Sequence, residues 1–371
     1  MNRETTAERL RRLVPQPKAY TILDGRSTTI RRRESDWLTV LRQLEAKPAE
    51  LGIVISPLDI ETFRSRNPAD VSPSIEAERM ASGTAEGYIL RIDGGRATIA
   101  ADSDSGHAHG RRTLAQLIAV ADDDQLPSVA IYDWPSLATR GFQICYHMVN
   151  DGMPMMAPSF DSAAEMIRAY AGFKMNALLL EIEAIFPYQG RPELSASFCF
   201  TEEQIAQLRE VCSASRVEII PLVQTVGHAY NVLRNPEYAH LREAPETSQQ
   251  YCTTNPQARS FLRDILIEVM EAFPESKRVH LGGDEARRLG ACPDCSAKLR
   301  DHGMGRLYGD HVNEVSEALI ERGLTPMVWG DIADNHPDIL EVLNPAVEIA
   351  YWNYDIAGGH SFDRLDTREA Q

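Results

Sequence analysis

Apolar and polar positions along the second part of the chain alternate between two periods. Short apolar runs typical of buried strands are separated by segments whose apolar residues recur every three or four positions, as in amphipathic helices. The predicted strands are RGFQICY (140–146), NALLLEI (176–182), VEIIPLV (217–223), RVHLGG (278–283), TPMVWGD (325–331) and AVEIAYW (346–352). The predicted helices cover 162–175, 201–215, 255–273, 308–322 and 337–343. This alternation predicts a parallel sheet covered by helices.

Residues 1–133 follow a different pattern. Strand-like runs occur at 50–57 and 86–101, and the second alternates on either side of Asp93-Gly94-Gly95, which is a hairpin signal. Residues 105–122 then have helical spacing. We therefore predict two domains, a small α+β domain over 1–133 and a larger α/β domain over 134–371.

Helix-capping residues support three of the helix assignments. Thr201 is predicted as the N-cap of one helix, and Asn255, followed by proline, as the N-cap of another. Asp161 or Ser162 is predicted to cap the helix that follows the first strand of the larger domain.

Two architectures fit the parallel sheet, a doubly wound sheet and a (β/α)8 barrel. Polar or aromatic residues follow several strands, and they are Glu181, Glu183, His228, Asp284, Glu285, Trp329, Asp331, Trp352 and Tyr354. A barrel gathers such residues around one mouth, whereas a doubly wound sheet usually carries a glycine-rich phosphate loop, which this sequence lacks. We favour a TIM-barrel-type domain that is truncated after about six strands.

Composition narrows the class of partner. The 371 residues contain 54 acidic and 38 basic side chains, a net charge of −16, which disfavours nucleic acid and anionic membranes. The first residues show no apolar signal-peptide core, and no apolar run approaches the roughly 18 residues of a membrane span. Six cysteines in so long a chain are no disulfide framework, so we expect a cytoplasmic protein with free thiols.

The pair Asp284-Glu285 carries the strongest chemical signal. It follows two glycines at the end of a predicted strand, where the backbone can turn enough for both side chains to face one mouth. Two ionised carboxylates this close repel each other, which favours one protonated general acid beside one anion that stabilises positive charge. The alternative is a solvated turn that caps the next helix.

The segment HLGGDE resembles the His-x-Gly-Gly-Asp-Glu signature of glycoside hydrolase family 20, the β-N-acetylhexosaminidases. The segment PLVQTVGHAYNVLRNPEYAHLRE is similar to the hexosaminidase D-like branch of this family. PMVWGD and YWNYD resemble its fifth and sixth strands, and residues 87–118 resemble the small domain that precedes its barrel.

The resemblance implies a retaining mechanism in which the substrate's own 2-acetamido oxygen attacks the anomeric carbon and forms an oxazolinium intermediate. It implies that Glu285 is the general acid and base and that Asp284 orients the acetamido group. The expected substrate is a small oligosaccharide or glycoconjugate with a terminal β-linked N-acetylglucosamine or N-acetylgalactosamine. No cofactor is implied, and the oligomeric state is left open.

The resemblance also implies a set of substrate-binding residues. Arg140 corresponds to an arginine that binds sugar hydroxyls, His228 to a pocket histidine, and Trp329 and Trp352 to walls of the acetamido pocket. Glu181 and Glu183 stand where many family members have histidine and aspartate. Asp331 and Tyr354 are weaker candidates, and His280 is expected to support the acids from within the barrel. Each of these residues could instead be structural.

Two further interpretations remain open. The chain could be an incomplete fragment of a longer enzyme, which we favour, or a non-catalytic sugar-binding remnant.

Cys292 and Cys295 form half of a zinc-ribbon pattern. Because no second pair has suitable spacing, we expect two free cysteines and no metal, with a structural metal as the less favoured alternative.

Overall fold

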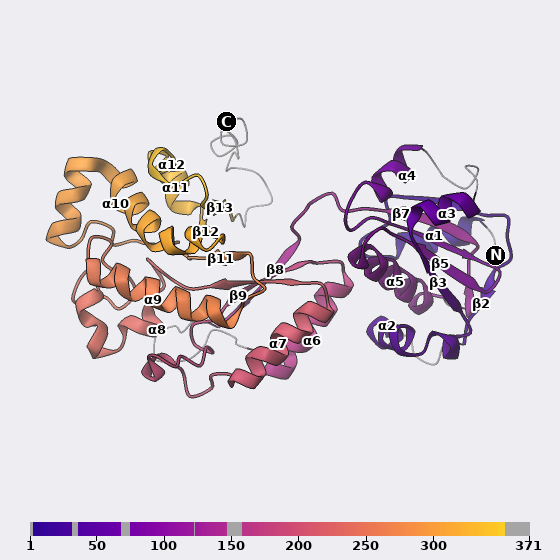
Figure 1. Cartoon of the computed structure of the whole chain (residues 1–371), viewed down its shortest axis with the longest axis horizontal. Coiled ribbons are helices and arrows are strands. Elements are labelled where there is room, and N and C mark those ends of the chain that lie inside the picture. Colours follow the sequence, from indigo (N-terminus) through magenta and orange to yellow (C-terminus); the bar gives the residue numbers. More distant parts are fainter. Residues whose placement is uncertain (1–2, 32–35, 68–74, 122, 147–157, 353–371) are drawn as a thin grey trace. The chain divides into compact units, whose positions relative to one another are not determined.

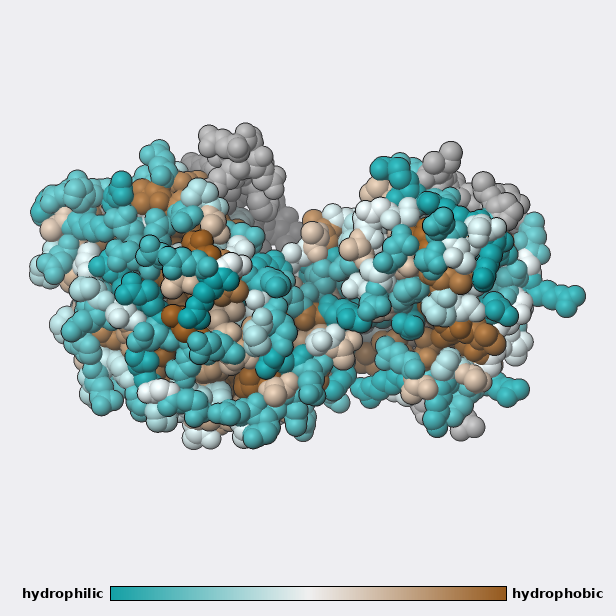
Figure 2. Space-filling model, in the orientation of Figure 1, coloured by the Kyte–Doolittle hydropathy of each residue, from teal (hydrophilic) through white to brown (hydrophobic). Residues whose placement is uncertain are grey.

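The computed structural model describes residues 3–31, 36–67, 75–121, 123–146 and 158–352. The chain forms two compact units (Figure 1). The first contains residues 1–140 and 165–176, and the second contains 141–164 and 177–371. Hydrophilic side chains cover most of the visible face of each unit (Figure 2). Among the helices of the described ranges, none is both long and apolar enough to cross a bilayer.

The first unit is built on a five-stranded sheet with the order β1-β7-β4-β5-β3. The strands are β1 (Ala19–Ile22), β3 (Val54–Leu58), β4 (Tyr88–Asp93), β5 (Arg96–Ala100) and β7 (Val129–Asp133), and β2 (Thr28–Thr29) pairs separately with β6 (Gln125–Leu126). Strands β3 and β5 run parallel, and the other neighbours in this sheet run antiparallel. The helices are α1 (Arg3–Arg11), α2 (Trp37–Ala46), α3 (Ile60–Arg66), α4 (Ile75–Ser82) and α5 (Asp104–Ala119).

The hairpin predicted at Asp93-Gly94-Gly95 is confirmed. Strands β4 and β5 pair antiparallel with Asp93 opposite Arg96, and both glycines between them have positive φ. A two-residue turn with that conformation suits the twist of the flanking strands. Alternate residues of β4 then face two cores, since Leu90 packs with α2 and α5 while Ile89 packs with α3 and α4.

The second unit contains a six-stranded parallel sheet with the order β13-β12-β11-β10-β9-β8. The strands are β8 (Gly141–Cys145), β9 (Ala177–Glu181), β10 (Glu218–Leu222), β11 (Arg278–His280), β12 (Thr325–Trp329) and β13 (Glu348–Ala350). Their order in space follows their order in the chain, whereas a doubly wound sheet reverses at a switch point. The prediction of a barrel-type α/β fold is confirmed, as a parallel half-barrel of six strands.

Helices connect the strands and cover the sheet (Figure 1). They are α6 (Phe160–Gly172), α7 (Glu202–Ala214), α8 (Tyr230–Leu233), α9 (Pro256–Ala272), α10 (Pro293–Glu321), α11 (Asp331–Asn335) and α12 (Ile339–Val342). The apolar residues that predicted the strands are buried, for example Leu178, Ile220, Val279 and Val328. Their burial is the main stabilisation available to a parallel sheet.

Helix starts were predicted with mixed success. The N-caps Thr201 and Asn255 are confirmed, and Thr201 forms a capping box with Gln204. The cap predicted at Asp161 or Ser162 is wrong, because α6 already begins at Phe160 and the Ser159 hydroxyl accepts a hydrogen bond from the Ser162 amide. Helix α10 begins well before the predicted residue 308 and is interrupted at Gly303, where φ is 78°.

Candidate active site

The carboxyl ends of the parallel strands carry most of the predicted site residues. Glu181 is the last residue of β9, and Trp329 is the last residue of β12. The turn that bears Asp284 follows the end of β11. Because neighbouring strands are parallel, these residues lie along one end of the sheet, where barrel enzymes build their active sites.

Two glycines shape the turn between β11 and the acids. Gly282 has a φ of 64° and Gly283 a φ of 90°, which side chains with a Cβ rarely adopt. A Cβ on Gly282 would lie 1.9 Å from Gln224 Oε1, and one on Gly283 would lie 2.3 Å from the Tyr308 hydroxyl. Both positions therefore require glycine for conformation and for space, and the turn brings the next two residues to the strand ends.

Asp284 and Glu285 both contact one imidazole. His228 Nε2 lies 3.4 Å from Asp284 Oδ2 and 3.5 Å from Glu285 Oε2. The three side chains are 27%, 18% and 42% exposed, so the acids are partly shielded but open to a ligand. The hydrogen bond with Asp284 is the largest cause that raises the pKa of His228, against the opposing effect of burial.

The loop after β10 places His228 by a close backbone contact. A Cβ on Gly227 would lie 2.2 Å from the backbone oxygen of Asp284, so only glycine lets the two loops approach this closely. His228 itself has a positive φ of 51°, and Glu285 one of 48°. Such conformations are uncommon for residues with side chains and cluster at functional sites.

Asp331 holds the backbone of Glu285. Its Oδ2 accepts a hydrogen bond of 3.0 Å from the Glu285 amide, while its Oδ1 is buried without a hydrogen-bond partner among the described residues. Burial is the largest cause that raises the pKa of Asp331. From the solvent side, Arg287 donates a 3.1 Å hydrogen bond to Glu285 Oε1. Glu285 is thus positioned through its backbone as well as its side chain.

Glu181 and Glu183 are buried more deeply than the pair Asp284-Glu285. Gln224 links them, donating from Nε2 to Glu181 Oε1 at 2.9 Å and from its backbone amide to Glu183 Oε1 at 3.0 Å. Cys145 donates to Glu181 Oε2 at 2.8 Å. Burial, followed by the charge of Glu181, raises the pKa of Glu183 well above its ordinary value.

His280 supports the glycine turn from inside the half-barrel. Its Nδ1 accepts a 3.0 Å hydrogen bond from the Gly282 amide, and its ring lies 4.3 Å from the ring of Trp329. Burial lowers the pKa of His280 to about 3, which keeps it neutral. Trp329 and Trp352, which follows β13, are both partly exposed at the strand ends. Aromatic side chains in this position can pack against the apolar face of a sugar.

Comparison with known families identifies this arrangement. Residues 120–361 match the catalytic domain of glycosyl hydrolase family 20, and residues 11–134 match domain 2 of the same family. The chain belongs to glycosyl hydrolase family 20. The resemblance carried by HLGGDE is therefore confirmed over most of the chain.

Relatives from several organisms agree with this assignment. Hexosaminidase D of Homo sapiens is 29% identical over 219 residues, which are 56% of this chain and 44% of the relative. The beta-hexosaminidase of Porphyromonas gingivalis is 25% identical over 348 residues, 79% of this chain and 42% of the relative. The chain spans about half the length of the curated relatives that it matches.

Solved structures share the fold at lower sequence identity. The chitobiase of Flavobacterium johnsoniae is 18% identical with a TM-score of 0.70, and the match covers 99% of this chain and 58% of that one. The β-N-acetylhexosaminidase of Bacteroides fragilis is also 18% identical, with a TM-score of 0.67, and the match covers 92% and 70% of the two chains.

One predicted site residue of this family 20 chain is not brought to the acids. Arg140 precedes the amino end of β8, whereas Asp284 and Glu285 follow the carboxyl end of β11 in the same parallel sheet. Its guanidinium is bound within the first unit, by Glu86 and by the backbone oxygens of residues 137 and 174. The role of Arg140 in sugar binding stays a prediction. Tyr354 lies outside the described residues.

Two residues that build the site, Gln224 and Tyr308, were not predicted from the sequence. Gln224 belongs to the QTVGH segment that carries the family resemblance, but its link to Glu181 and Glu183 depends on packing. Tyr308 donates a 3.2 Å hydrogen bond to the backbone oxygen of Gly283 from the distant helix α10. No spacing in the sequence connects Tyr308 with that turn, because the contact is formed only when α10 packs against the sheet.

Proposed function

We propose that this chain acts as an exo-β-N-acetylhexosaminidase that removes terminal β-linked N-acetylglucosamine or N-acetylgalactosamine from small oligosaccharides or glycoconjugates. The observation that carries the proposal is the contact of Asp284 and Glu285 with one imidazole at the strand ends of a family 20 half-barrel. The hexosaminidase names of its relatives support the same activity.

In the proposed reaction the substrate supplies the nucleophile. Glu285 donates a proton to the glycosidic oxygen while the acetamido oxygen attacks the anomeric carbon, so the carbon–oxygen bond breaks and an oxazolinium ion forms. Glu285, now ionised, removes a proton from water, which opens the oxazolinium with retained configuration. Glu285 ends the cycle protonated.

Asp284 is suited to orient the acetamido group. One of its carboxylate oxygens contacts His228, and the other, Oδ1, is buried and has no hydrogen-bond partner among the described residues. In the proposed complex the acetamido N–H supplies the donor that this buried oxygen lacks, and the anion stabilises the positive charge that develops on the oxazolinium.

The positions of the other carboxyls support substrate assistance. A protein nucleophile would have to face the general acid across the sugar at about 5–5.5 Å. Glu181 and Glu183 are buried and bound through Gln224, and Asp331 binds the backbone of Glu285. Because hydrogen bonds already hold these three carboxyls in place, the acetamido oxygen is the better candidate.

The test compares Glu285→Gln with the unchanged chain on two chromogenic β-N-acetylhexosaminides that differ in leaving-group acidity. We expect a loss of about 10²–10⁴-fold in kcat/KM for the poor leaving group, the range for general acid catalysis, and a smaller loss for the good one. The matched control is Glu271→Gln, which changes an exposed carboxyl on α9 and should leave both rates unchanged.

Equal rates for Glu285→Gln and the unchanged chain would reject the role of Glu285. Substrate assistance is tested separately with a thiazoline that mimics the oxazoline and with the β-glucoside that lacks the acetamido group. Binding of the thiazoline and no hydrolysis of the glucoside are expected. A chain that binds the thiazoline but hydrolyses none of the substrates would be the non-catalytic remnant.

A further inference from the structure

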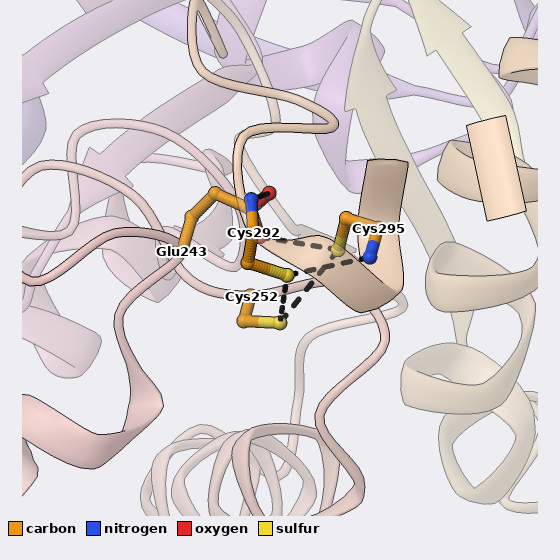
Figure 3. Close-up of side chains that lie close together, drawn as sticks. All are labelled: Glu243, Cys252, Cys292 and Cys295. Atoms are coloured by element: carbon orange, nitrogen blue, oxygen red, sulfur yellow. Dashed lines mark hydrogen bonds between the residues drawn. The ribbon is translucent and has the colours of Figure 1, made fainter. Parts of the chain in front are cut away.

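Three cysteines and one glutamate meet outside the active site. They are Glu243, Cys252, Cys292 and Cys295, and one ligand atom from each lies within 4.8 Å of all the others. Figure 3 shows their side chains converging from separate segments of the chain. Cys252 and Cys295 are buried, and Cys292 is partly exposed.

The spacing of these atoms suits a tetrahedral metal ion. Cys252 Sγ lies 3.6 Å from Cys292 Sγ and 3.6 Å from Cys295 Sγ, and Cys295 Sγ lies 3.1 Å from Glu243 Oε2. A tetrahedral zinc with bonds of about 2.3 Å to sulfur and about 2.0 Å to oxygen separates its ligands by about 3.8 Å and about 3.5 Å. The observed distances are within a few tenths of an ångström of that geometry.

The ligands come from two loops that follow neighbouring strands. Glu243 and Cys252 belong to the loop after β10, in which Glu243 N donates to Gln250 O and Cys252 N to Leu241 O. Cys292 is the N-cap of α10, after β11, and Cys295 lies in its first turn. This pairing explains why no second C-x-x-C is present, since the other two ligands are a cysteine and a glutamate from an irregular loop.

Surrounding hydrogen bonds hold the ligands in place. The Cys295 amide donates to Cys292 Sγ at 3.3 Å, as expected of a C-x-x-C turn at a metal, and the Cys292 amide donates to Glu243 Oε1 at 3.0 Å. Thr254 Oγ1 lies 3.1 Å from Cys295 Sγ. Such partners orient ligands and offset their charge, as does the positive end of the helix that Cys292 begins.

We infer that Glu243, Cys252, Cys292 and Cys295 bind one structural Zn²⁺ ion. Four protein ligands complete the tetrahedral shell, which is the arrangement of a closed structural site rather than a catalytic one. On binding, the three thiols release their protons to solvent. The inference revises the expectation of two free cysteines and no metal, and it does not depend on the hydrolase activity.

The ion would link the two loops that carry the candidate active site. His228 belongs to the loop after β10, and Asp284 and Glu285 to the loop after β11. The same loops are already joined by a 2.8 Å hydrogen bond from the Arg288 amide to Gln250 Oε1. Zinc at the cysteine cluster would fix this connection more firmly than hydrogen bonds alone.

The experiment loads the whole chain with Zn²⁺ under reducing conditions, removes excess metal by gel filtration and measures metal by mass spectrometry. We expect about one zinc per unchanged chain, as for a closed site. Cys292→Ser and Cys295→Ser should retain far less. Cys199→Ser alters a cysteine outside the cluster and should retain as much as the unchanged chain.

A folded unchanged chain that retains no zinc, or a Cys292→Ser chain that retains as much as the unchanged one, would overturn the inference. Because the variants could fail to fold, Co²⁺ is also titrated into the unchanged chain. Thiolate-to-cobalt charge transfer with the intense visible bands of tetrahedral cobalt is expected. A weak octahedral spectrum, or a disulfide between two of the three cysteines in the reduced preparation, would contradict the site.

Discussion

His228 is the residue at which the two acids of the candidate site meet. Its pKa is raised chiefly by the hydrogen bond with Asp284, with further contributions from the charges of Asp284, Glu181 and Glu285. A histidine whose pKa is higher in the folded than in the unfolded chain stabilises the fold fully below its unfolded pKa of about 6.5. That contribution is lost as the pH rises through the folded pKa.

We therefore predict that His228→Gln lowers the free energy of unfolding most below about pH 6.5 and progressively less at higher pH. Urea unfolding of both chains over a pH series measures this difference. Burial lowers the pKa values of His280 and His311 to about 3 and about 4. Both histidines are present in the two chains, so their contributions to the free energy of unfolding cancel in the difference. A difference that stays constant with pH would show that His228 is not protonated in the folded chain.

At the scale of elements, the short strand β11 and its glycine turn decide where the acids lie. The sequence predicts the strand and the glycines, and the structure shows why glycine is needed, since Gly282 packs against the side chain of Gln224. Gly323, after α10, offers a comparison because its φ of 76° is similar but its missing Cβ would meet nothing within 4 Å.

Gly282→Ala is predicted to cost clearly more stability than Gly323→Ala. The Gly323 variant should lose about 1–2 kcal/mol from the left-handed backbone alone. The Gly282 variant adds an overlap with Gln224 that forces the buried side chain to move. Chemical unfolding of both variants measures the two losses of free energy of unfolding. Equal losses would mean that the Gln224 side chain moves aside without destabilising the fold.

At the scale of the whole molecule, a buried ion pair joins distant parts of the first unit. Lys174 Nζ lies 2.7 Å from Asp133 Oδ2, and both side chains are less than a tenth exposed. Lys174 belongs to the segment 165–176, far in sequence from the rest of that unit. Tyr88 donates to the same Asp133 oxygen at 3.0 Å and also contacts Lys174 Nζ.

Lys174→Met should destabilise the chain by about 3–5 kcal/mol, because it leaves the charge of Asp133 buried without its partner. Lys47→Met removes an exposed pair with Glu50 and should cost at most about 1 kcal/mol. Adding Asp133→Asn to Lys174→Met removes the unpaired charge and should recover part of the loss. Thermal unfolding measures the loss of stability in each variant. Similar losses for Lys174→Met and Lys47→Met would show that the buried ion pair does not stabilise the fold more than the exposed one.

Local patterns in the amino-acid sequence determined the secondary-structure elements of this protein and indicated its family. The apolar runs specified the six parallel strands, the pair Gly94-Gly95 specified a hairpin, and Thr201 and Asn255 specified helix starts, because each depends on residues near in sequence. The segment HLGGDE likewise indicated the family, because its glycines and acids are adjacent in the sequence and form a single turn. The assignment of catalytic roles to Asp284 and Glu285 stays a prediction.

Only the tertiary structure decided the contacts between segments that are distant in the chain. It placed His228 on both acids, bound the guanidinium of Arg140 to Glu86, and brought Glu243 and Cys252 to the C-x-x-C turn. Each of these contacts depends on how strands and helices pack, and the spacing of apolar residues in the sequence does not predict that packing. Local residues set the elements, while the order of the parallel strands determines which loops meet and so which side chains can act together.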